Sequence, residues 1–101
     1  MTPSEYRGHE QDLREVLGIC NPFLSQEAVA DVEHRLDHAE IEMAFESLCL
    51  SIRGEGVIIP EGVKAVLLHL GPALGVDKAS ALEENFWGNM LLFLDPSTKI
   101  N

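Results

Sequence analysis

The chain has 101 residues, 46% of them hydrophobic, and 17 acidic side chains against seven basic ones give it a net charge of −10. This length supports one domain with one hydrophobic core, and the hydrophobic content is too high for a disordered chain. The charge argues against a protein that binds nucleic acid or anionic membranes directly, because such proteins need clustered Lys and Arg.

A first helix is predicted over residues 3–17. Thr2 is its expected N-cap, and Glu5 completes a capping box in which two free backbone amides are satisfied. Pro3 suits the first helical position because its missing N–H has no partner there in any case. The segment has no cationic stretch followed by an apolar run, so it does not resemble a signal peptide, and we expect a cytoplasmic protein.

Two further helices are predicted over 26–36 and 39–53. Ser25 is the expected N-cap of the first, and Asp37 with Glu40 is the expected capping box of the second. The helix over 39–53 has the clearest amphipathic pattern in the chain, in which apolar residues recur every three or four positions: Ile41, Ala44, Phe45, Leu48, Cys49 and Ile52. Such a stripe buries one side of a helix in a bundle.

The remaining chain predicts an extended loop over 57–59, a helix over 60–70 and a helix over 78–87 that starts after Asp77. A last apolar segment follows over 90–94. The predicted fold is therefore all-α, a small single-domain bundle of four to five helices that comprises residues 1–101.

No pattern in the sequence predicts an enzyme, a metal site or a cofactor. His34 and His38 have the spacing of zinc ligands on a helix, but the zinc-protease pattern needs Glu directly after the first His, where this chain has Arg35. The predicted cap at Asp37 also places the two histidines in different helices. Cys49 lies on the apolar stripe, where thiols are buried and unreactive.

The acidic run from 27 to 46 is the strongest functional feature, with seven carboxylates and one cation, Arg35. The helix macrodipole favours acidic residues in a first turn, but it does not account for Glu46 in mid-helix, four residues after Glu42. Like charges at that spacing cost about 0.2–0.5 kcal/mol. We therefore interpret the run as a surface that attracts a basic protein, rather than as a merely solvated one. The candidate partner-binding residues are Glu27, Asp31, Glu33, Asp37, Glu40, Glu42 and Glu46, with direct contact expected at Asp31, Glu33, Glu42 and Glu46.

Residues 38–52, with the sequence HAEIEMAFESLCLSI, resemble the Maf-type immunity proteins, as do the following turn and the helix after it. The matching residues are Glu40, Glu42, Ala44, Phe45, Glu46, Leu48 and Cys49. Members of this family are small, acidic, helical partners of secreted bacterial toxins. The resemblance implies an immunity protein that binds and neutralises a basic toxin domain, expected to be a nuclease.

Two alternatives stay open at this point. One is an acidic helical adaptor that binds a different basic protein. The other is a homodimeric regulator that buries Trp87 and the apolar segment over 90–94 between two copies. Trp87 follows Glu83 and Glu84, a combination that suits a protein interface, although the indole can equally belong to the core.

Overall fold

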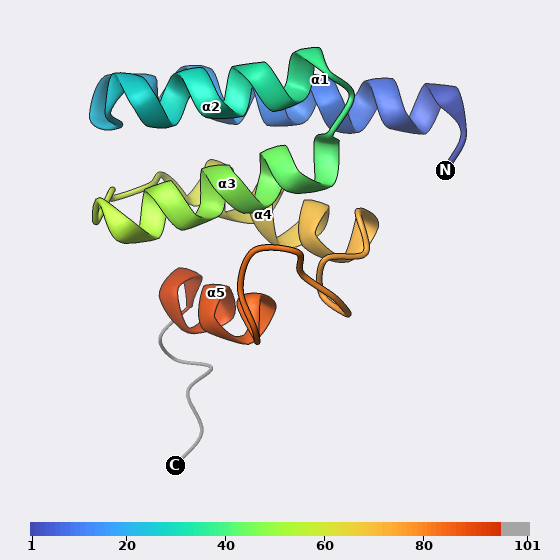
Figure 1. Ribbon diagram of the computed structural model, residues 1–101. Helices are drawn as coiled ribbons and strands as arrows, with labels where there is room; N and C mark the ends of the chain where they lie inside the picture. Colours follow the sequence, from blue (N-terminus) through green and yellow to red (C-terminus); the bar gives the residue numbers. More distant parts are fainter. Residues whose placement is uncertain (96–101) are drawn as a thin grey trace.

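All elements in the computed structural model, which describes residues 1–95, are helical (Figure 1). They are α1 (Pro3–Cys20), the 3₁₀ turn η1 (Asn21–Phe23), α2 (Gln26–Asp37), α3 (Ile41–Gly54), α4 (Glu61–Ala73) and α5 (Phe86–Leu94). The Cα radius of gyration is 12.8 Å, the value expected of one compact domain of this length. The predicted all-α, single-domain fold is therefore confirmed.

The first two helices begin where their sequence signals place them. Thr2 Oγ1 accepts a hydrogen bond from the Glu5 amide, and Glu5 Oε1 accepts one from the Thr2 amide, both at 3.2 Å. Ser25 Oγ accepts a hydrogen bond from the Ala28 amide at 3.2 Å. α1 continues beyond the predicted end at residue 17 because Cys20 extends its buried side.

The capping box predicted at Asp37 and Glu40 is wrong. Asp37 is the last residue of α2, and its Oδ1 accepts a hydrogen bond from Arg14 Nη2 of α1 at 3.1 Å. α3 begins at Ile41, later than predicted, and no side chain caps it. The Asp37 carboxylate thus forms an ion pair with Arg14 of α1 and does not cap the start of α3, although the local pattern predicted that it would.

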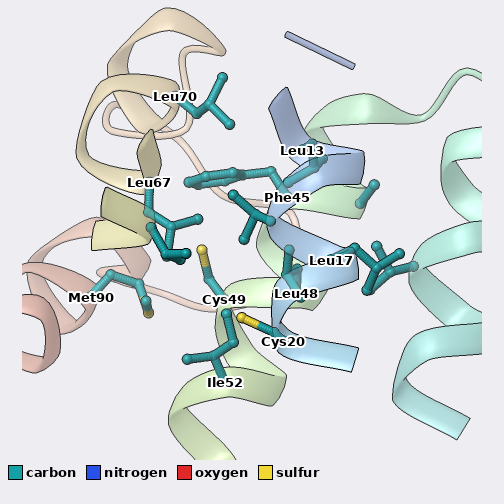
Figure 2. Packing of buried hydrophobic residues seen from close by; sticks show 14 of the residues in the cluster. Leu13, Leu17, Cys20, Phe45, Leu48, Cys49, Ile52, Leu67, Leu70 and Met90 are labelled. Atoms are coloured by element: carbon teal, nitrogen blue, oxygen red, sulfur yellow. The ribbon is translucent and has the colours of Figure 1, made fainter. Parts of the chain in front are cut away.

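α3 is the central helix of the bundle. It packs against α1 and α2 on one side and α5 on the other, while α4 contacts both α1 and α5 (Figure 1). The six residues of its predicted stripe are all buried, with exposed fractions of 1% or less. Figure 2 shows Phe45, Leu48 and Cys49 of α3 in one apolar cluster with Leu17 of α1, Leu67 of α4 and Met90 of α5. Burial of each large apolar side chain contributes about 1.5–3 kcal/mol of hydrophobic free energy.

The helix predicted over 78–87 is wrong. Residues 78–85 form turns and bends, and the last helix begins only at Phe86. Ser80 Oγ accepts hydrogen bonds from the amides of Leu82 and Glu83 at 3.2 and 3.1 Å. Such local side-chain bonds offer the backbone an alternative to a helix. The segment therefore folds as a turn, in spite of its helix-like start after Asp77.

α5 forms instead because its apolar residues recur at four-residue steps. Phe86, Met90 and Leu94 are buried in the core of the same chain, with exposed fractions of 2% or less. Trp87 is half-buried, and its indole packs against Gly71 of α4. Within the apolar segment over 90–94, Met90 and Leu94 thus belong to the core of one copy, whereas Leu92 is 45% exposed, so burial of this segment between two copies stays a prediction.

A polar cluster fixes the 78–85 segment to α3 and α5. Arg53 Nη2 donates hydrogen bonds to both carboxylate oxygens of Glu83, at 2.7 and 2.6 Å. Asn89 Nδ2 donates another to Glu83 Oε1 at 2.9 Å. The bonds from Arg53 favour the charged carboxylate most, so the pKa of Glu83 lies below its ordinary value of 4.5.

The stability of the protein should therefore depend on Glu83 in an acid-sensitive way. A carboxyl group whose pKa is lowered by folding stabilises the folded state above about pH 4.5 and loses that contribution as the pH falls through the folded-state pKa. We expect Glu83→Gln to lower the Tm at about pH 7, and the difference from the wild type to shrink below about pH 4.5. Thermal melts followed by circular dichroism measure this, with exposed Glu84→Gln as the matched control. A Tm difference that does not change with pH would contradict the prediction.

Candidate partner-binding surface

Six of the seven predicted carboxylates lie exposed on α2, the turn after it and the first turn of α3. They are Glu27, Asp31, Glu33, Asp37, Glu40 and Glu42. Because α2 packs along α3, these residues lie on one pair of neighbouring helices. Their contact with a partner stays a prediction.

Two arginines form ion pairs with some of these exposed carboxylates and not with others. Arg35 Nε lies 3.1 Å from Asp31 Oδ2, and its Nη1 lies 3.9 Å from Glu40 Oε1. Arg14 of α1 lies 3.1 Å from Asp37 and 3.0 Å from Glu10. Sequence reasoning missed Arg14 because only its spacing from Glu10 is a local signal, whereas Asp37 is 23 residues away. Half of the exposed carboxylates are thus partly neutralised within the protein.

The carboxylates of Glu27, Glu33 and Glu42 form no hydrogen bond or ion pair within residues 1–95. Glu42 nevertheless has an electrostatic effect on α1. Burial, followed by the charges of Glu10 and Glu42, raises the pKa of the Tyr6 hydroxyl. These three uncompensated carboxylates are the part of the acidic run that is most open to a cationic partner.

Glu46 does not belong to this surface, which corrects the sequence-based prediction. Its side chain is only 1% exposed, and its Oε1 is buried without a hydrogen-bond partner among the described residues. The physical reason is the central position of α3, which is covered by helices on more than one side. A residue outside the apolar stripe of such a helix can still be buried. Glu46 therefore cannot contact a partner in this conformation.

His34 of α2 and His38 directly after it lie together, with ring centroids 4.2 Å apart, and not in separate helices, because α2 extends to Asp37. His38 is the C-cap residue, and its Nδ1 lies 2.8 Å from the carbonyl oxygen of His34. No group of three or more metal-binding side chains occurs among residues 1–95. Cys20 and Cys49 are both buried and free, and burial raises the pKa of each thiol, as expected of unreactive cysteines.

The Trp87 side chain is partly in the core and partly at the surface. Its ring lies 6.3 Å from Phe45 and 6.5 Å from Phe86 between centroids, so part of the indole belongs to the core. Another part lines a hollow of about 460 Å³ together with Glu83 and Glu84. Glu83 is held by Arg53, so Glu84 is the more available carboxylate at this place.

No family model, curated protein or solved structure matches this chain. Within residues 1–95, no helix combines the length and the apolar character needed to cross a bilayer.

Proposed function

We propose that this protein is an immunity protein that binds and neutralises a basic toxin domain, with a nuclease as the expected toxin. The single observation that carries the proposal is the set of three exposed, uncompensated carboxylates on α2 and α3: Glu27, Glu33 and Glu42. The net charge of −10 and the resemblance of residues 38–52 to Maf-type immunity proteins support it further.

A nuclease binds phosphate with clustered cations, so carboxylates on a folded surface can occupy the place of the phosphates. Charge complementarity of this kind accelerates association, up to about 10⁸–10⁹ M⁻¹s⁻¹ at low salt. Asp31, Asp37 and Glu40 would contribute to the field, although their arginine partners reduce that contribution. The all-α fold presents these groups on regular helices, which limits the entropy lost on binding.

Reversal of charge tests the proposal directly. We expect the double variant Glu33→Lys and Glu42→Lys to bind the toxin domain at least about tenfold more weakly at low salt, mainly through slower association. The difference should shrink as salt screens the exposed charges. Surface plasmon resonance against the product of the neighbouring gene measures both rates. Glu84→Lys, an exposed reversal elsewhere on the molecule, is the matched control.

Unchanged binding of the double variant would show that this surface is not the interface. The adaptor alternative makes a different prediction, because it requires the same acidic surface but a partner without toxin activity. Co-expression distinguishes the two: an immunity protein restores the growth of cells that produce the toxin domain, whereas an adaptor does not.

A further inference from the structure

Two hollows lie between the same two antiparallel segments of the chain, and we treat them together as one groove. One side is α1 and η1, from Asp12 to Phe23, and the other is the chain from Val66 back through the α3–α4 loop to Glu55. The hollows have volumes of about 170 Å³ at the α1–α4 end and about 350 Å³ at the η1 end. η1 and the α3–α4 loop lie at the same end of the molecule (Figure 1).

The groove is lined by apolar side chains that the fold leaves uncovered. Ile58 is 94% exposed, Phe23 66% and Ile19 49%. Single exposed apolar residues are ordinary on protein surfaces. Three of them along one groove, next to buried Val16 and Val63, form an apolar patch of the kind that marks an interaction site.

The charges beside this patch are all negative. Asp12 and Glu15 line the smaller hollow, and Glu55 lines the larger one, with no Lys, Arg or His lining either. Glu55 is held in place because its carboxylate accepts hydrogen bonds from the Ser25 amide at 2.9 Å and the Ser25 hydroxyl at 3.3 Å. An occupant that complements this groove is therefore apolar along its centre and cationic at its edges.

A second copy of this chain does not have that chemistry. A symmetric dimer uses the same surface on both subunits, so it would bring the carboxylates of the two grooves toward each other. Each subunit also carries a net charge of −10, and like charges oppose such an association.

We propose that this groove binds a cationic amphipathic helix of a protein partner. The α1 side of the groove is about 12 Å long from Asp12 to Cys20 at 1.5 Å per residue, and η1 adds about 6 Å at 2.0 Å per residue, which together match about three turns of a bound helix. Apolar residues at helical spacing would contact Ile19, Phe23 and Ile58, as in other helix-in-groove complexes. This inference goes beyond the proposed function, because it concerns a different surface and does not require a toxin as the partner.

Gly62 provides a selective way to block the groove. It lines the smaller hollow, and a Cβ added to it would meet no atom within 4 Å, so a side chain at this position starts into open space. Gly18 of α1 is the matched control, since it is also helical and unobstructed but lines neither hollow.

The test uses a fluorescein-labelled peptide of about 14 residues, composed of Leu and Lys with the leucines at helical spacing, and measures its binding to the full chain by fluorescence anisotropy. We expect Gly62→Leu to weaken binding by about tenfold or more, and the double variant Phe23→Ser and Ile58→Ser to do the same. Gly18→Leu should stay within about twofold of the wild type.

Equal affinity of all these variants, or equal binding of a peptide with the same composition in scrambled order, would show attraction by general charge alone and would overturn the inference. Analytical ultracentrifugation of the protein without peptide measures whether a second copy of the chain occupies the groove. A dimer that Ile58→Ser dissociates would assign the groove to a second copy and would also overturn it. Neither result bears on the toxin proposal, which is tested at Glu33 and Glu42.

Discussion

Gly71→Ala should lower the free energy of unfolding by about 1–3 kcal/mol, although Ala is normally favoured over Gly inside a helix by up to about 1 kcal/mol. The cause is Trp87. A Cβ on Gly71 would overlap the six-membered ring of the indole, which packs directly on the α4 backbone at this point. The ring cannot move away freely, because it also contacts the Phe45 and Phe86 side chains. Overpacking of this kind forces helices apart or side chains out of their preferred rotamers.

Urea unfolding followed by circular dichroism measures the change at Gly71. Gly62→Ala is the matched control in the same helix, and it should be neutral or stabilising because its Cβ meets nothing within 4 Å. Adding Trp87→Leu to Gly71→Ala should recover part of the loss, because the two substitutions share one contact and are not additive. Equal stabilities of Gly71→Ala and Gly62→Ala would contradict this account of the α4–α5 contact.

The second large effect is expected at Glu46. Glu46→Met keeps the length of the side chain but removes a buried carboxylate whose Oε1 has no partner, so the free energy of unfolding should rise by about 1–3 kcal/mol. Glu46→Lys puts an uncompensated cation at the same buried position and should lower the free energy of unfolding by about 3 kcal/mol or more.

Glu42 is the matched control for Glu46, because it lies one turn earlier on the same helix and is exposed. Glu42→Met and Glu42→Lys should each change the free energy of unfolding by no more than about 0.5 kcal/mol. Chemical denaturation of the four variants measures the contrast. Similar effects at the two positions would show that Glu46 is accessible to solvent. If the contrast is found, a charge reversal at Glu46 reports on folding and cannot be used to map a binding surface.

The parts of the fold that depend on neighbouring residues followed from the sequence. The Thr2–Glu5 capping box and the Ser25 cap need only contacts within one turn, and both form as predicted. The stripe of α3 was also confirmed, because its six residues share one side of one helix. These features depend on spacing along the chain, which the sequence shows directly.

The errors arose where a side-chain contact that the helix pattern does not show decides the outcome. The Asp37 carboxylate pairs with Arg14 and does not serve as the predicted helix cap, and no residue near Asp37 in the sequence indicates that pairing. Ser80 and the bonds from Arg53 to Glu83 fold the 78–85 segment as a turn, although its local pattern favours a helix. At the candidate surface, the sequence located six exposed carboxylates. It could not distinguish the paired ones from the free ones, nor show that other helices cover Glu46.

The packing of Trp87 on α4 has a practical consequence for spectroscopy. The chain has one tryptophan and one tyrosine, and they lie in different helices, Trp87 in α5 and Tyr6 in α1. Indole emission therefore reports on the docking of α5, while phenol absorbance reports on α1, whose Tyr6 hydroxyl is buried. If both signals change at the same urea concentration, the two ends of the bundle unfold as one cooperative unit. If the emission changes first, α5 separates from a bundle in which α1 is still in place.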